Sequence, residues 1–109
     1  MEEAVAYDRS KIIGILGLAY KANVGDLRES PSIKLAHILQ SRGYKVLGCE
    51  PYVNLDDIEG IPNISLEKIV SESDLLVLTL THSVFLNNIQ TIASKKVIDV
   101  VGAMRKARL

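Results

Sequence analysis

The sequence is poor in cysteine and aromatic residues: it has one cysteine, no tryptophan and one phenylalanine in 109 residues. A single cysteine excludes an internal disulfide and a metal site built from several cysteines, which suits a reducing compartment. No apolar run approaches the roughly 20 residues of a membrane-spanning helix. The first ten residues, MEEAVAYDRS, are acidic and polar, whereas a signal peptide is basic and then apolar. We therefore expect a cytoplasmic protein without membrane contact.

Net charge is also lacking, because 13 Lys and Arg residues balance 13 Asp and Glu residues. No long-range field would attract nucleic acid or an anionic membrane, so any anion has to be bound by local groups. The length suits one domain and is too short for an enzyme with a cleft between two domains. We expect one domain over residues 11–109. Residues 1–10 show little hydrophobic periodicity and are expected to be a lead-in or linker outside the core.

Short apolar runs alternate with amphipathic segments along the rest of the chain. The run from Lys11 to Gly17 is almost continuously apolar, which is typical of a strand buried on both faces of a parallel sheet. Ser30 can cap a helix that has Pro31 at its first position and ends before Gly43. Further strands are predicted at 44–49, 74–80 and 96–101, further helices at 65–71 and 82–93, and a loop at 53–63.

This alternation of strands and helices implies right-handed crossovers between parallel strands. We therefore predict an α/β fold, namely a Rossmann-like three-layer domain with a mostly parallel sheet of about four or five strands. Ligands of such sheets bind outside the carboxyl ends of the strands, near the point where the strand order reverses, and the first strand normally borders that point.

The loop after the first strand, GLAYKANVGDLRESPS at residues 17–32, leaves from that point. It lacks the G-x-G-x-x-G pattern of dinucleotide-binding loops. It carries Lys21, a compact charge suited to phosphate, and Arg28, whose planar fork binds phosphate or carboxylate. By chemistry alone a solvated surface is the commoner explanation, since Asp26 lies nearby. Tyr20 by itself fits a core aromatic better than a ligand contact.

The string Gly17-Leu-Ala-Tyr-Lys21, followed by Asn23 and Asp26-Leu-Arg-Glu-Ser-Pro31, resembles the opening of the carboxyl-terminal domain of nucleotide-sugar dehydrogenases. This family includes UDP-glucose, GDP-mannose and UDP-N-acetylmannosamine dehydrogenases. A looser similarity continues through Gly43-Tyr-Lys-Val, Glu50-Pro51-Tyr52, His82-Ser-Val-Phe85 and Val97-Ile-Asp99.

The resemblance implies an enzyme that oxidises the C6 alcohol of a sugar nucleotide to a carboxylate in two NAD-linked steps. In such enzymes an amino-terminal Rossmann domain binds NAD, a helical middle domain forms much of the dimer, and the carboxyl-terminal domain holds the UDP or GDP moiety. It further implies that Tyr20, through its backbone, and Lys21 contact the UDP-sugar substrate. Arg28 would reach across the interdomain cleft toward NAD.

The NAD-binding fingerprint, the middle domain and the catalytic-cysteine segment of the family are missing from this sequence. The chain therefore looks like a fragment of a dehydrogenase that is inactive alone, with no catalytic residue and no metal ligand of its own. The complete enzyme is expected to be a homodimer or a higher oligomer. A stand-alone nucleotide-binding or regulatory module and a structural interaction domain are the alternatives.

Some residues depart from the family pattern or allow two interpretations. Val101 stands where the family carries a basic residue that helps to hold the nucleotide, and Arg105 or Lys106 could replace that cation. Glu50 occupies the position of a ribose-binding carboxylate in a Rossmann sheet, but ordering the turn before Pro51 is the favoured role.

Cys49 and His82 are the two other residues whose side chains could be chemically reactive. Cys49 ends the second predicted strand and is expected to be a buried structural thiol. His82 resembles the His-x-x-Phe of the branch that acts on N-acetylated hexosamines. A capping or surface position is nevertheless the commoner role for a histidine at a helix start.

Overall fold

The computed structural model describes residues 2–101, which are organised around a four-stranded parallel sheet. The strand order is β2-β1-β5-β6, and every neighbouring pair is parallel. β1 pairs with β2 on one side and with β5 on the other, so the chain reverses its direction of travel across the sheet at β1. The strands are β1 (Ile12–Leu16), β2 (Lys45–Cys49), β5 (Leu75–Leu78) and β6 (Lys96–Asp99).

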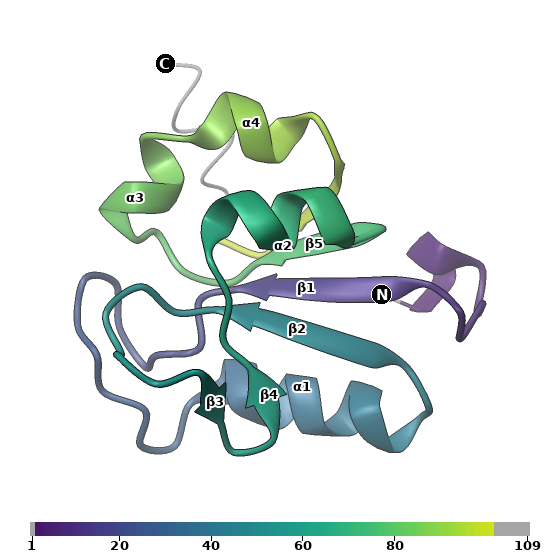
Figure 1. Ribbon diagram of the computed structural model, residues 1–109, viewed down its shortest axis with the longest axis horizontal. Coiled ribbons are helices and arrows are strands. Elements are labelled where there is room, and N and C mark those ends of the chain that lie inside the picture. Colours follow the sequence, from purple (N-terminus) through teal and green to yellow (C-terminus); the bar gives the residue numbers. More distant parts are fainter. Residues whose placement is uncertain (1, 102–109) are drawn as a thin grey trace.

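Helices cover both faces of the sheet, which confirms the predicted three-layer α/β fold (Figure 1). One face packs against α1 (Pro31–Ser41) and against a small antiparallel hairpin of β3 (Asp57–Ile58) and β4 (Ile61–Pro62). The other face packs against α2 (Leu66–Glu72), α3 (Ser83–Leu86) and α4 (Ile89–Ala93).

Each strand supplies both cores, because successive side chains point to opposite faces of a sheet. Ile13 and Ile15 belong to the core beneath α1, whereas Leu16 belongs to the core beneath the other helices. β5 divides in the same way, with Leu75 and Val77 on the first face. All of these side chains are fully buried, which explains why the strands read as continuous apolar runs.

Helix α1 begins and ends where the sequence predicts. The Ser30 hydroxyl accepts a hydrogen bond from the Ile33 amide, and Pro31 occupies the first helical position. At the other end Gly43 adopts a φ of +93°, a conformation that glycine reaches without a Cβ penalty. The second helix is confirmed in the same way, with Ser65 as its N-cap.

Two predicted segments differ from the structure. The helix predicted over 82–93 is two short helices, because the chain turns at Asn87 and Asn88. The loop predicted over 53–63 contains the β3–β4 hairpin, whose turn is closed by a bond from the Gly60 amide to the Asp57 carboxylate. Each hairpin strand has two residues, which is too short to produce a recognisable alternation.

The amino-terminal segment is attached to the domain by both apolar and charged contacts. Val5, in a 3-10 helix over Glu2–Val5, is buried in the core beneath α1, so the expectation that residues 1–10 lie outside the core was wrong for this residue. Glu2 forms ion pairs with Arg42 and Arg9, and it accepts a hydrogen bond from the Tyr44 hydroxyl.

Gly14 lies directly against Ile69 of α2 and the C-cap residue Ser73, and a substitution there tests this packing. A Cβ at this position would collide with Ser73 Oγ and lie 2.8 Å from Ile69 Cγ1. We expect Gly14→Ala to lower the free energy of unfolding by about 1–3 kcal/mol, because the added methyl group overpacks the contact. Urea denaturation followed by circular dichroism measures this change.

Ser73→Ala provides the matched background. Ser73 Oγ is buried and has no hydrogen-bond partner within the described part of the chain, so its removal should be tolerated. Gly14→Ala should then lower the free energy of unfolding by less in the Ser73→Ala protein than in the wild type. An equal cost in both backgrounds would contradict the proposed contact.

Candidate functional site

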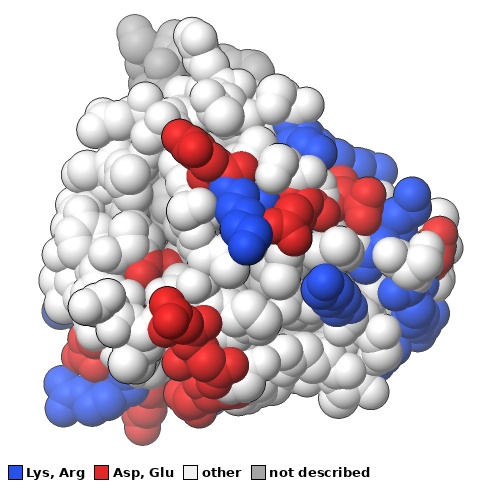
Figure 2. Space-filling model, in the orientation of Figure 1, with Lys and Arg blue, Asp and Glu red and all other residues white. Residues whose placement is uncertain are grey.

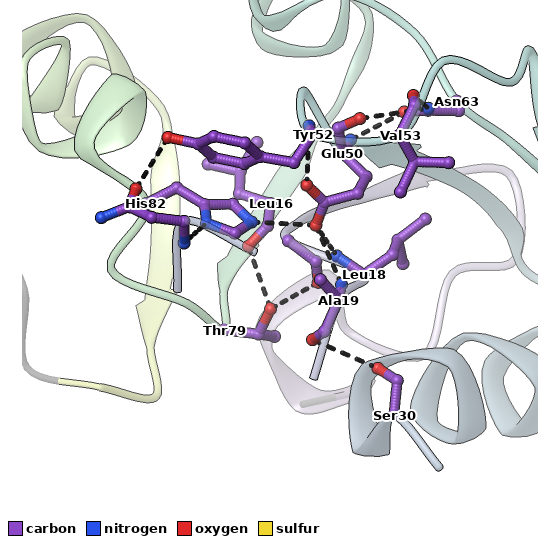
Figure 3. A network of polar contacts seen from close by, with 12 residues as sticks. Leu16, Leu18, Ala19, Ser30, Glu50, Tyr52, Val53, Asn63, Thr79 and His82 are labelled. Carbon is purple, nitrogen blue, oxygen red and sulfur yellow. Dashed lines mark hydrogen bonds and ion pairs between the residues drawn. The ribbon is translucent and has the colours of Figure 1, made fainter. Parts of the chain in front are cut away.

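The carboxyl ends of β1, β2 and β5 bring three loop segments together, namely residues 17–30, 50–56 and 79–82. The Gly17 amide donates to the Cys49 carbonyl, which joins the end of β1 to the end of β2. The Thr79 hydroxyl lies 2.9 Å from the Leu16 carbonyl oxygen and 2.7 Å from that of Gly17 (Figure 3). The loop that starts at Gly17 therefore leaves from a fixed point between two strands.

Glu50 is the centre of this edge, although it is only 1% exposed (Figure 3). Its Oε1 accepts hydrogen bonds from the amides of Leu18 (3.0 Å) and Ala19 (2.9 Å), and Oε2 accepts one from the Tyr52 amide (3.1 Å). Burial alone would raise the pKa of Glu50, but hydrogen bonds from His82 and from the Tyr52 and Ala19 amides lower it below the usual value. The carboxylate is thus occupied by the protein itself, which supports the favoured ordering role over ribose binding.

His82 is fully buried beside Glu50, so the expectation of a surface position was wrong. It does occupy the N-cap position of α3, but its side chain makes no capping hydrogen bond. Its Nε2 lies 2.9 Å from Glu50 Oε1, and its Nδ1 lies 2.7 Å from the backbone nitrogen of Asn23. A backbone N–H can only donate, so Nδ1 must be the acceptor and Nε2 must carry the proton. The ring also packs against Tyr52 and Phe85, with centroid distances of 4.7 and 5.2 Å.

Two asparagines complete the hydrogen-bond network. Asn23 has a φ of +62°, and its Oδ1 accepts from the Tyr52 hydroxyl and the Ser83 amide. Asn63 accepts from the Glu50 amide and donates to the carbonyls of three residues in the 50–55 segment, namely Glu50, Val53 and Leu55. Asn63 could not be identified from the sequence, since an asparagine in a polar loop carries no distinctive signal.

Tyr20 lies on the surface, although its chemistry alone favoured a core position. The side chain is 51% exposed, so that interpretation was wrong. It borders a hollow of about 310 Å³ between the 17–30 loop, the start of α1 and the end of β5. The neighbouring Lys21 is exposed. The other residues that line the hollow are mostly apolar: Ala19, Pro31, Ser32, Leu35, Thr79, Leu80 and Val100.

Arg28 is held by Asp26 at the far end of the same loop. Its Nε and one terminal nitrogen lie 3.1 and 3.0 Å from the two Asp26 carboxylate oxygens, while 89% of the Arg28 side chain is exposed. This bidentate hydrogen bonding lowers the pKa of Asp26 to about 2. Together with Tyr20 and Glu29 the pair lines a second hollow, which is larger and more open than the first.

Charge is distributed in small groups over the face shown in Figure 2, and neither sign covers it. Basic side chains are most numerous toward the edge where β1 and β2 begin, whereas acidic ones lie both over the upper part of this face and around the loops and the hairpin. An anion at the site would therefore depend on individual side chains such as Lys21, as the balanced composition predicts.

The remaining predicted residues have simpler environments. Cys49 is buried, as expected, and desolvation raises the pKa of its thiol to about 12. Val101 is half-buried, and Arg105 and Lys106 lie outside the described residues. Residues 2–101 contain no group of three or more His, Cys, Asp or Glu side chains that could hold a metal ion. None of the helices in that range is long and apolar enough to cross a membrane.

The sequence is similar to several nucleotide-sugar dehydrogenases. Over 113 residues it is 31% identical to an NDP-N-acetyl-D-galactosaminuronic acid dehydrogenase of Ralstonia solanacearum, an alignment that covers 100% of this chain and 27% of that protein. It is 34% identical to a GDP-mannose 6-dehydrogenase of Pseudomonas aeruginosa, covering 91% of this chain and 26% of that one. The chain thus spans about a quarter of the length of these relatives.

Solved structures agree with the sequence comparison. A ternary complex of GDP-mannose dehydrogenase from Pseudomonas aeruginosa superposes with a TM-score of 0.76 at 32% identity, over 94% of this chain and 27% of that one. A UDP-D-ManNAc dehydrogenase from Pyrococcus horikoshii gives a TM-score of 0.68 at 32% identity, over 87% and 22% of the two chains. Residues 14–106 match the UDP binding domain of the UDP-glucose/GDP-mannose dehydrogenase family. The chain therefore belongs to the UDP-glucose/GDP-mannose dehydrogenase family, of which it represents the UDP binding domain.

Proposed function

We propose that the domain binds the nucleotide diphosphate part of a UDP-sugar through the 17–30 loop, with Tyr20 and Lys21 as the contacting residues. The observation that carries this proposal is the form of the loop. Its backbone is anchored at Leu18, Ala19 and Asn23 by buried groups, whereas Tyr20 and Lys21 between these anchors are exposed. A preorganised loop that presents a cation beside an apolar hollow suits a ligand with a phosphate group and a flat ring.

The second part of the proposal concerns the complete enzyme. The chain covers only about a quarter of relatives that are named as dehydrogenases, so we propose that it works as the carboxyl-terminal part of an NAD-dependent nucleotide-sugar 6-dehydrogenase. Such an enzyme would oxidise the sugar C6 alcohol to a carboxylate, with NAD bound mainly by a separate amino-terminal domain. The isolated chain would bind its ligand without catalysing hydride transfer. The assembled enzyme would be a homodimer or a higher oligomer.

Arg28 is the residue that we assign to the cofactor. Its guanidinium is exposed on the loop and already oriented by Asp26. A planar fork held in this way can share its remaining N–H groups with a phosphate or carboxylate from another domain. The proposed roles thus separate along the loop, with Lys21 near the sugar nucleotide and Arg28 toward NAD.

Replacing Lys21 tests the ligand role. We expect Lys21→Ala to weaken UDP binding by about 10- to 100-fold, or roughly 1.5–3 kcal/mol, because one charge-assisted contact to phosphate is lost. The free energy of unfolding should hardly change, since an exposed loop cation contributes little to the core. Amide NMR titration with UDP, UDP-N-acetylglucosamine and NAD measures the affinities, and buffer-matched phosphate serves as the control ligand.

Lys68→Ala is the matched control variant, because Lys68 is an exposed lysine on α2. It should bind UDP like the wild type. A Lys21→Ala protein that unfolds, or one that binds UDP with unchanged affinity, would show that the ligand role assigned to Lys21 is wrong.

Replacing Arg28 tests its pairing with Asp26. In Arg28→Ala the pKa of Asp26 should rise from about 2 toward its ordinary value of 3.8, because the hydrogen bonds from Arg28 are the main cause of the shift. Arg28→Lys should give an intermediate pKa, since it keeps the charge and loses the fork. Carboxyl ¹³C NMR titration follows this group directly. UDP affinity should be unchanged in both variants, and an unchanged Asp26 pKa would refute the pairing.

A further inference from the structure

We propose that His82 and Glu50 are positioning residues that hold the two ends of the Tyr20–Lys21 segment, so that ligand affinity depends on the tautomer of a histidine that does not contact the ligand. This inference rests on the proposed function of the loop. The two side chains form one buried hydrogen-bonded pair, in which both residues are at most 1% exposed. The pair reaches the loop on both sides of its exposed residues.

Glu50 holds the near end of the segment. One carboxylate oxygen accepts hydrogen bonds from the backbone amides of Leu18 and Ala19, the two residues immediately before Tyr20 (Figure 3). These are charge-assisted bonds between buried groups, which are the stronger kind of hydrogen bond in proteins. Because the carboxylate also bonds to the Tyr52 amide, it cannot rotate without leaving a buried N–H unpaired.

His82 holds the far end of the segment. Its Nδ1 accepts the backbone N–H of Asn23, two residues after Lys21, at 2.7 Å. Nδ1 can accept this bond only while the ring proton resides on Nε2, and the bond from Nε2 to Glu50 fixes the proton there. Glu50 therefore controls the far end of the segment through His82, as well as the near end directly.

Two substitutions of His82 separate its two hydrogen bonds. An asparagine Oδ1 lies near the position of Nδ1, so His82→Asn keeps an acceptor for the Asn23 amide and loses the bond to Glu50. A glutamine Nε2 lies near the position of the histidine Nε2, so His82→Gln keeps the bond to Glu50 and loses the acceptor. Both remove the same ring from its contacts with Tyr52 and Phe85, so their packing losses are comparable.

We expect His82→Gln to bind UDP about tenfold more weakly than His82→Asn at comparable stability, because only the glutamine leaves the Asn23 amide unpaired. Asn23 Oδ1 still accepts hydrogen bonds from the Tyr52 hydroxyl and the Ser83 amide, so the loop should loosen rather than unfold. Calorimetric titration with UDP measures the affinity of each variant, and urea denaturation measures its free energy of unfolding. Phe85→Leu, which alters the buried ring beside His82 without changing a polar group, should lose stability and keep UDP affinity.

Hydrogen exchange provides a readout that needs no ligand. In the unliganded His82→Gln protein the Asn23 amide should exchange at least about tenfold faster than in His82→Asn, while the Ala19 amide stays equally protected in both. Equal exchange of Asn23 in the two variants would overturn the proposal. A long-range ¹H–¹⁵N spectrum of the wild type that placed the ring proton on Nδ1 would overturn it as well.

These measurements distinguish failure of this inference from failure of the proposed function. If the exchange rates differ as expected but the wild type does not bind UDP, then Glu50 and His82 do hold both ends of the Tyr20–Lys21 segment, and the ligand assignment is wrong. If the wild type binds UDP and both His82 variants bind it with equal affinity, the ligand assignment stands and the positioning role of His82 is wrong.

Discussion

The buried carboxylate of Glu50 is the constraint on which the rest of this edge depends. An ionised carboxylate inside a protein is costly unless donors replace the water that it loses, and a buried charge without partners is among the most destabilising features of a fold. Here the donors are three backbone amides and one imidazole, and they come from three segments far apart in the sequence. Satisfying one charge therefore fixes the positions of the 17–30 loop, the turn after β2 and the start of α3 together.

The sheet topology is what makes this convergence possible. β1 lies between β2 and β5, so the segments that follow these three strands emerge side by side at one edge. Glu50 follows β2, His82 follows β5, and the amides that they bind belong to the loop after β1. A different strand order would place the same residues at separate points along the edge, and the carboxylate would lose its donors from Leu18, Ala19 and His82.

In the same arrangement the side chains of Tyr20 and Lys21, the proposed ligand contacts, point away from the core, while the Tyr20 amide donates to the Asp26 carbonyl within the loop. The amides before Tyr20 and after Lys21 are occupied by the buried pair, while both side chains are exposed. Arg28 is oriented by a carboxylate on its own loop rather than by the core. A ligand bound at this loop would not have to order it first, which is the advantage of preorganisation. In a dehydrogenase assembled from several domains, such a loop would offer one cation to each side of the cleft.

The α/β class, the buried strands, the caps of α1 and α2 and the family could all be predicted from the sequence, because each depends on a local pattern or a dense motif. The sequence also showed which loop carries Tyr20, Lys21 and Arg28. The exposure of Tyr20, the place of Val5 in the core and the burial of His82 against Glu50 became known only from the folded chain. These outcomes depend on which segments meet across the sheet, 32 positions apart for Glu50 and His82. No local periodicity records a contact over that separation, so the residues that hold the site were visible in the sequence only as a polar turn and a histidine.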